Sequence, residues 1–292
     1  MSNYSIHQFS SITGINKILL RTWENRYTFL VSHRSSTNIR YYDDDMIVRA
    51  LNIKTLIQNG VKVSKIDKLT NTEITSTVEK MYNSESLDDS VEYYILKLIE
   101  ATLNFDKNLT DKVFDLGVKE FGLINFYRIV LLPTLNKIGT LWLTRSLSPS
   151  QEHFLAEQIK IKISLAIGST EIKASKDTWL LFLPENELHD IGLQIAHLIL
   201  KLEGCKVLYL GSNLPINSLI DVKEKVQIKN ILYFNLSNQS LENTHSRVDK
   251  LMEIFPNSIQ YLVTHKQYLK DINKHPNLKI LTEIDDLLKA VK

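Results

Sequence analysis

The chain has 292 residues, of which 43% are hydrophobic and 23% are charged, the composition of a globular protein with roughly two or three domains. The single cysteine, Cys205, excludes an internal disulfide and a thiolate metal cluster, so a reducing compartment is expected. No apolar run approaches the roughly 18 residues that span a bilayer, and the N-terminus lacks a signal-peptide pattern. We therefore predict a cytoplasmic protein with no membrane partner.

Charge is unevenly distributed along the chain. Residues 1–70 hold ten Lys and Arg against five Asp and Glu, a net charge of +5, whereas the remaining 25 basic and 28 acidic side chains give −3. A basic N-terminal end on a slightly acidic body indicates a polyanionic partner at that end. An ordinary solvated surface can carry the same net charge, so the charge alone does not distinguish a polyanion-binding face from a solvated one.

The first 70 residues predict a small helical domain with a β-hairpin. Two short helices are expected over 4–11 and 15–27, and the tight break at Thr13-Gly14 between them is typical of a helix-turn-helix. Residues 28–42 lose the helical period and predict a wing. Two further helices are expected at 43–60, where three acidic residues open the helix favourably, and at about 63–69.

The rest of the chain changes its period twice. Residues 71–88 are polar and predict a linker, and 89–172 repeat apolar residues at three- and four-residue spacing, which predicts a four-helix bundle. From 173 to 292 short apolar runs alternate with helical patterns, which predicts a flavodoxin-like, doubly wound parallel sheet. The fold class is therefore multi-domain, α and α/β: winged helix-turn-helix (1–70), linker, bundle and flavodoxin-like domain.

The second helix carries R-T-W-E-N-R-Y at residues 21–27, and the wing follows with Arg34 and then N-I-R-Y-Y at 38–42. In this order the residues resemble the MerR family of regulators, which share an R-x-W/Y-E-x-R-Y helix and a wing with R-x5-R-x-Y. The resemblance covers about residues 4–70 and implies a domain that binds double-stranded operator DNA as a dimer. Asn38 stands where the family usually has Gly, and Asn tolerates the left-handed backbone of such a turn better than most residues.

The reading helix and the wing each supply candidate DNA contacts. A helix fits the major groove, where exposed polar side chains reach base edges, so the start of the second helix is expected to contact bases or nearby phosphates. The wing arginines are expected to meet phosphates or the minor groove, and one of two wing tyrosines to donate to a phosphate. The candidate DNA-binding residues are Asn16, Lys17, Arg21, Arg26, Arg34, Arg40, Tyr41 and Tyr42.

Structural roles compete with DNA contact at several of these positions. Trp23 and Tyr27 lie four residues apart and are expected to pack the small core. For Glu24 and Arg26 the alternative to a DNA contact is an internal salt bridge. For any single arginine the alternative is a solvated side chain without a contact to DNA.

The segment E-L-H-D-I-G at residues 187–192 directly follows the expected strand TWLLFLP. His189 therefore lies at the carboxyl end of a strand, where open α/β sheets bind ligands. Glu187 is near enough to orient the imidazole, and Gly192 lets another group approach the backbone. The segment resembles the D/E-x-H-x-x-G motif of cobalamin-binding domains, which implies that His189 ligates cobalt; otherwise it is a hydrogen-bonded histidine at a strand end.

A second group of residues spans two helices of the expected bundle. Trp142 ends one helix, and Glu152 and His153 lie in the first turn of the next, after the helix start S-P-S-Q at 148–151. The W-x9-E-H spacing and the domain order resemble cobalamin-dependent MerR-type photoreceptors. The resemblance implies adenosyl- or methylcobalamin as cofactor, with Trp142 over its upper face; the alternative for Trp142 is bundle core.

Three positions depart from the cobalamin-binding pattern. N-L-S at 235–237 stands where S-x-L is usual, and Thr264-His265 stands where Gly-Gly leaves room for the cofactor's nucleotide tail. Leu143 replaces a histidine that light-sensing members carry directly after the cap tryptophan. We expect Thr264 and His265 to crowd the tail, and Leu143 to leave no second histidine ligand after photolysis.

These features predict a sequence-specific DNA-binding transcriptional regulator, homodimeric or of higher homo-oligomeric order, with a C-terminal sensor domain that resembles cobalamin-binding modules. The alternative retains DNA binding, but its C-terminal half has lost cobalamin and serves dimerisation or partner binding. The sequence offers no nucleophile–base pair, Gly-rich phosphate loop or spare substrate domain, so an enzyme is not expected.

Overall fold

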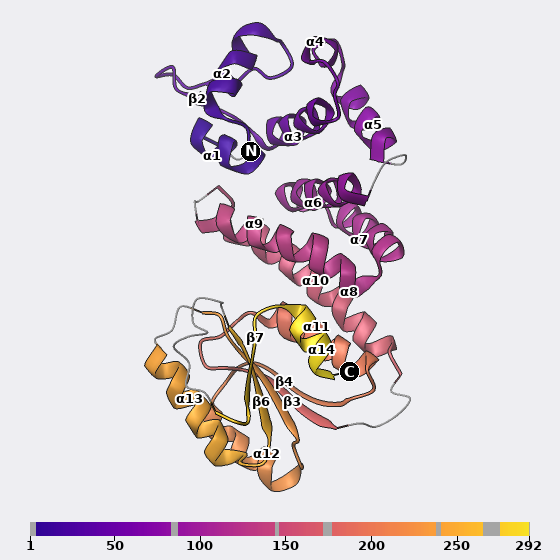
Figure 1. The fold of residues 1–292 in the computed structure, drawn as a ribbon. Coiled ribbons are helices and arrows are strands. Elements are labelled where there is room, and N and C mark those ends of the chain that lie inside the picture. Colours follow the sequence, from indigo (N-terminus) through magenta and orange to yellow (C-terminus); the bar gives the residue numbers. More distant parts are fainter. Residues whose placement is uncertain are drawn as a thin grey trace. The chain divides into compact units, whose positions relative to one another are not determined.

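The computed structural model describes residues 4–82, 87–143, 146–171, 177–237, 241–264 and 275–291. Two compact units make up the chain, Met1–Gln158 and Ile159–Lys292 (Figure 1). Within these ranges, the first is helical apart from one small hairpin, and the second contains a parallel sheet. Across the described ranges, no helix is both long and apolar enough to cross a membrane.

The expected helix-turn-helix forms from α1 (Ile6–Thr13) and α2 (Lys17–Arg26). A capping box between Ser5 and Gln8 begins α1, and Gly14 ends it in the left-handed conformation, with φ at 64°. The wing is the antiparallel pair β1 (His33–Arg34) and β2 (Arg40–Tyr41). Asn38 in its turn has φ at 64°, so asparagine does form the turn in which the family usually has glycine.

Aromatic side chains form much of the core of this N-terminal domain. Phe9 stacks on Tyr42 with 4.1 Å between ring centroids, and Trp23 meets Phe29 edge to face at 5.4 Å. Tyr27 stacks on the same Phe29 at 5.3 Å, so Trp23 and Tyr27 pack the core as expected. The domain is completed by α3 (Asp44–Gln58) and α4 (Val63–Ile66).

Residues 71–82 were expected to begin a linker, but they form helix α5 (Asn71–Tyr82). Thr70 and Glu73 make its capping box, and Ile74 and Val78, four residues apart and each 1% exposed, bury one stripe of the helix. Because α5 contacts α3, a stripe of only two aliphatic residues is enough to dock it. Residues 83–86 of the expected linker lie outside the described ranges.

The bundle predicted for 89–172 is built from α6 (Leu87–Asn104), α7 (Lys107–Phe121), a composite helix and α10 (Pro149–Ser169). The composite helix runs through α8 (Leu123–Phe126), the π-helical turn η1 (Tyr127–Leu131) and α9 (Leu132–Leu143). In η1 the N–H of Leu132 bonds to the carbonyl of Tyr127, which widens the helix just before Pro133, whose nitrogen has no hydrogen to donate.

The second unit confirms the flavodoxin-like prediction. Its parallel sheet has the strand order β4-β3-β5-β6-β7, with central strands buried on both faces. In Figure 1, α11 and α14 lie on one face of the sheet and α12 and α13 on the other. The strands are β3 (Thr178–Pro184), β4 (Lys206–Leu214), β5 (Asn230–Asn235), β6 (Ile259–Thr264) and β7 (Leu278–Leu281). The helices are α11 (Asp190–Leu202), η2 (Ile216–Leu219), α12 (Ile220–Lys225), α13 (Leu241–Ile254) and α14 (Ile284–Val291).

Candidate DNA-reading face and ligand site

Helix α2 divides cleanly into a buried side and an exposed side. Leu20 and Trp23 face the core, whereas Lys17 and Arg21 are exposed. Asn16 is the N-cap, and its side-chain oxygen accepts a hydrogen bond from the backbone N–H of Ile18 at 2.8 Å. The oxygen of Asn16 is thus engaged, which leaves its amide nitrogen for the base or phosphate contact considered for this residue.

A buried carboxylate fixes the wing to the reading helix. Glu24, with a side chain only 6% exposed, accepts a hydrogen bond from Arg40 Nε at 2.8 Å and another from the Tyr42 hydroxyl at 2.7 Å. Its partner is therefore Arg40 rather than Arg26, which is exposed in the last turn of α2. On the wing, exposed Arg34 donates to Asn38 Oδ1 at 2.7 Å across the turn.

The two wing tyrosines differ in burial and in hydrogen bonding. Tyr42 is fully buried, and both burial and its hydrogen bond to Glu24 raise the pKa of its hydroxyl. Because the Tyr42 hydroxyl donates its proton to Glu24 inside the domain, it is not available to donate to a DNA phosphate. Tyr41 is half-buried beside His33, at 5.2 Å between ring centroids.

At the carboxyl end of β3, Glu187 accepts hydrogen bonds from two different loops. It is fully buried, and its Oε1 accepts from the His189 ring nitrogen Nδ1, from two backbone N–H groups and from the Ser237 hydroxyl. Its Oε2 accepts from the backbone N–H groups of Leu236 at 2.7 Å and Ser237 at 2.8 Å. The His189 side chain is 56% exposed, and because Nδ1 is engaged, Nε2 is the nitrogen available to a ligand.

Each of the two groups favours the charged form of the other. Burial alone would raise the pKa of Glu187, but hydrogen bonds from His189 and from the Ser237 and Leu236 backbone lower it to about 2. The hydrogen bond to Glu187 in turn raises the pKa of His189 above its ordinary value, against the opposing effect of its burial. Glu187 thus fixes the ring orientation, as a carboxylate does for a metal-ligating histidine.

Gly192 admits a neighbouring side chain of the protein itself. A Cβ at this position would lie 2.7 Å from the ring of Phe234, so the close approach expected at Gly192 is made by the end of β5. The sequence predicted a close approach at Gly192, but it could not identify the approaching group.

A polar network covers the carboxyl ends of β5 and β6. Asn235 is buried, donates to Thr244 at 2.8 Å and accepts from Arg247 at 3.0 Å. Thr264, 2% exposed, donates its hydroxyl proton to the Asn235 carbonyl at 3.1 Å. Thr264 is thus buried within this network, and His265 lies outside the described residues.

The three cap candidates lie in the first unit. Trp142, at the end of α9, is 46% exposed, so it is not an interior residue of the bundle as this unit stands. Ser148 and Gln151 form the predicted capping box of α10. Glu152 and His153 lie in its first turn, with His153 Nε2 3.9 Å from Glu152 Oε2. The side chain of Leu143 is outside the described part of the chain.

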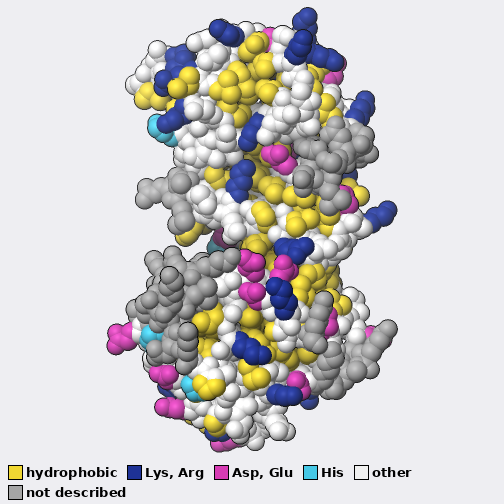
Figure 2. All heavy atoms as spheres, in the orientation of Figure 1, with side chains coloured by type: hydrophobic (Ala, Val, Ile, Leu, Met, Phe, Trp, Pro, Cys, Tyr) yellow, Lys and Arg dark blue, Asp and Glu magenta, His cyan; other side chains and the backbone are white. Residues whose placement is uncertain are grey.

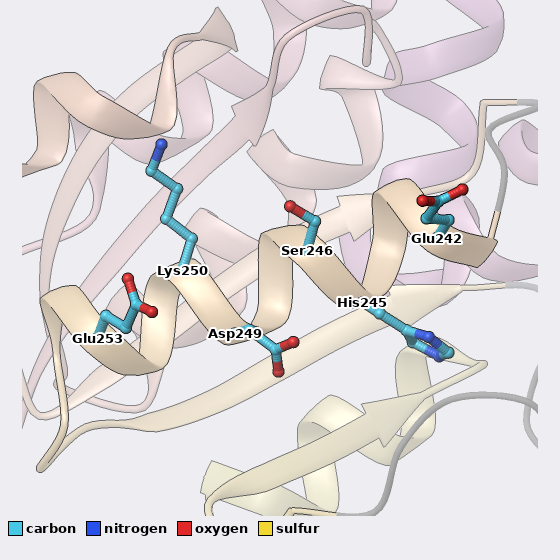
Figure 3. Close-up of a pocket in the computed structure, with 6 residues that line it drawn as sticks. All are labelled: Glu242, His245, Ser246, Asp249, Lys250 and Glu253. Carbon is cyan, nitrogen blue, oxygen red and sulfur yellow. The ribbon is translucent and has the colours of Figure 1, made fainter.

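A shallow hollow in the second unit lies apart from the residues around His189. Its lining residues come from α13 alone and spread along the helix (Figure 3). These are Glu242, His245, Ser246, Asp249, Lys250 and Glu253. Within the described ranges, no group of three or more His, Cys, Asp and Glu side chains is placed to hold a metal ion.

Sequence reasoning missed three of these contacts. The bridge from Glu24 to Arg40 and Tyr42, the bonds from Ser237 to Glu187, and the contact of Phe234 with Gly192 all join residues distant in sequence. The positions of Ser237 and Phe234 at the end of β5, adjacent to β3, were the available signal, because parallel strands bring their carboxyl ends together.

Two family models match the chain. Residues 4–73 match "MerR HTH family regulatory protein", and residues 94–166, which include most of the bundle, match "B12 binding domain". The HTH-type transcriptional repressor CarH of Myxococcus xanthus is 22% identical over 259 residues, 88% of this chain and 86% of that protein. The HTH-type transcriptional regulator MlrA of Escherichia coli is 37% identical over 73 residues, 25% of this chain and 30% of that protein.

A solved structure supports the fold of the C-terminal part. The Methanosarcina barkeri monomethylamine corrinoid protein covers 70% of this chain and 98% of its own, with a TM-score of 0.55 and 12% identity. At that identity the likeness concerns the fold alone. The two family matches place a MerR-type helix-turn-helix and a B12 binding domain in one chain, which is therefore a DNA-binding transcriptional regulator of that type.

Proposed function

We propose that this regulator binds a pseudo-palindromic operator as a homodimer or higher homo-oligomer, and that cobalamin held at His189 alters that binding. The observation that carries the cofactor part is the buried Glu187 carboxylate, which takes Nδ1 of His189 and leaves Nε2 exposed. A histidine whose other ring nitrogen is held by a carboxylate is the usual arrangement of a metal-ligating histidine. We infer a regulatory rather than a catalytic role.

The DNA part of the proposal assigns base contacts to the start of α2 and phosphate contacts to the wing. Asn16, Lys17 and Arg21 are exposed at the first two turns of α2. Arg34 and Tyr41 are offered by the wing, and Arg26 is exposed at the far end of α2. Arg40 has its Nε committed to Glu24, so its remaining guanidinium nitrogens are the ones proposed for DNA.

The residues near His189 fit a corrinoid at one end and oppose it at the other. Cobalamin would supply a cobalt ion, and Nε2 of His189 would hold it, because an imidazole nitrogen is a suitable ligand for this metal. At the carboxyl end of β6, however, the buried side chain of Thr264 stands where the resemblance puts the cofactor's tail. We therefore expect binding that depends on His189 and is weak, and we propose Trp142, Glu152 and His153 as further cofactor-binding residues.

A second candidate function follows from the same obstruction. The network around Asn235 and the contact of Phe234 with Gly192 favour a C-terminal half that has lost cobalamin and serves dimerisation or partner binding. Titration with a corrinoid separates the two candidates, because only the first gives a histidine-dependent spectrum.

Titration of the full chain with adenosyl- and methylcobalamin should give a shift in the visible spectrum that His189→Ala abolishes. His245→Ala, which removes a histidine from α13 in the same unit, should leave the shift unchanged. Illumination should give no long-lived bis-histidine spectrum, because Leu143 stands where light-sensing members have a second histidine. Identical spectra of wild type and His189→Ala would support the candidate without cobalamin.

The histidine-dependent shift should also depend on pH. A proton on Nε2 excludes a metal from that nitrogen, and the hydrogen bond to Glu187 raises the pKa of His189. Ligation is therefore expected to weaken as pH falls through this raised pKa, at a higher pH than for an ordinary histidine. The spectral shift measured across the neutral range checks this, and a shift that grows on acidification would contradict it.

Thr264→Gly should strengthen cobalamin binding. The substitution removes a buried side chain from the sheet edge and frees the carbonyl of Asn235, so the obstruction to the cofactor's tail is reduced. The Kd from the same titration measures the effect, and Ser258→Gly, which removes a buried hydroxyl bonded to the Ile228 carbonyl just before β6, is the control. A Kd that is unchanged in Thr264→Gly would show that this side chain is not the obstacle.

A further inference from the structure

Ile18 is the most unusual residue on the exposed side of α2. It is 74% exposed, although isoleucine is among the residues most often buried. With roughly 100° per residue, Ile18 lies about 150° around the helix from Leu20 and Trp23, the two residues that face the core. Ile18 thus stands near the centre of the face that points directly away from the protein.

Polar and basic side chains surround this isoleucine. Lys17 precedes it, Arg21 follows one turn later and Asn25 follows two turns later, and all three are exposed. In Figure 2, basic and hydrophobic side chains intermingle over the N-terminal part of the molecule. An aliphatic side chain framed by cations suits a partner that combines phosphates with apolar groups, which is what the DNA major groove presents.

We infer that Ile18 reads the C5-methyl group of a thymine in the major groove. The inference rests on the proposed role of α2 as the reading helix and adds a base identity to it. Thymine is the base that shows an apolar group there, and aliphatic side chains contact that methyl. Because isoleucine is β-branched, its χ1 is already restricted in a helix, so little rotamer freedom remains to be lost on binding.

Leu19 provides a matched comparison on the same helix. It is 43% exposed, but it lies roughly 100° around the helix from Ile18, toward the flank of the reading face. The two residues are adjacent aliphatics of equal size, so truncating each to alanine removes similar apolar surface. Only Ile18 is assigned a contact with a base.

The test uses the full chain and a duplex that it selects from a randomised library. Each thymine of that duplex is replaced in turn by deoxyuridine, which lacks the methyl group and retains the same hydrogen-bonding edge. Replacement of one particular thymine in each half-site should lower the affinity of the wild-type protein about fourfold, the equivalent of one buried methyl group. Ile18→Ala should bind the thymine duplex more weakly and lose this sensitivity to uridine, whereas Leu19→Ala should retain it.

Two results would overturn the inference: a wild type that tolerates uridine at every position, or an Ile18→Ala variant as sensitive to uridine as the wild type. Arg21→Ala, measured on the same duplex, separates this failure from failure of the proposed function. If Arg21→Ala weakens binding while uridine has no effect, α2 reads DNA but Ile18 reads no methyl group. If neither matters, the placement of α2 itself is wrong.

Discussion

Replacing Arg21 with alanine is expected to weaken operator binding by about 1–3 kcal/mol, or roughly 5- to 150-fold. Arg21 is exposed on α2 one turn after Lys17, so its guanidinium is available to a base edge or a phosphate. Fluorescence anisotropy with the selected duplex, at several salt concentrations, measures the loss. A base contact should leave the salt dependence unchanged, whereas a phosphate contact should lower its slope by about one.

Arg128→Ala is the matched control, because it removes the same charge from an exposed position on the bundle. Its effect on affinity should be small. If Arg21→Ala combined with Arg34→Ala leaves affinity unchanged, neither the reading helix nor the wing is where we place it. Arg34 is the better wing residue to remove, since loss of Arg40 also deprives Glu24 of its ion-pair partner.

Replacing Glu187 with alanine should destabilise the second unit by about 3 kcal/mol, because several donors lose a buried charged acceptor and each hydrogen bond to a charged group contributes about 1.5–3 kcal/mol. The backbone N–H groups of Leu236 and Ser237 and the ring of His189 all lose their acceptor. Urea denaturation of the two proteins measures the difference. Glu185→Ala, an exposed carboxylate two residues earlier, should change stability by less than about 0.5 kcal/mol.

Acid should have the same effect as the Glu187 substitution. The folded pKa of Glu187 is lowered to about 2, against about 4.3 in an unfolded chain. A lowered pKa stabilises the folded state above the unfolded value, and that stability is lost as pH falls from about 4.3 toward 2. The contribution is about 3 kcal/mol by linkage. A Glu187→Ala variant with the same loss of stability in this range would contradict the assignment.

Much of this molecule is predictable from its sequence, because its signals are local. The R-x-W-E-x-R-Y helix, the wing and the alternation of strands and helices each lie in a continuous stretch, and each forms as expected. Helix α5 was missed because only Ile74 and Val78 are apolar on its buried stripe, and their burial depends on α3. Its capping box at Thr70 and Glu73 was the local signal that favoured a helix.

The candidate sites were less predictable, because they depend on partners from distant segments. Sequence placed Glu187 beside His189 correctly, but nothing local indicated that Ser237 would bind the same carboxylate. Likewise, Tyr42 reads as one of two equivalent wing tyrosines until its hydroxyl is found on Glu24. Which tyrosine faces the solvent is decided by tertiary packing and not by spacing in the chain.

The bridge from Glu24 to Arg40 and Tyr42 has a consequence for how operator preference can change. It lies on the inward side of α2 and joins that helix to the wing, while Lys17, Ile18 and Arg21 project outward. Substitutions among the outward residues therefore leave the bridge intact. A redesign that exchanges only those outward residues should retarget the protein to new half-sites at little cost in folding, whereas the distance between groove and wing contacts stays fixed.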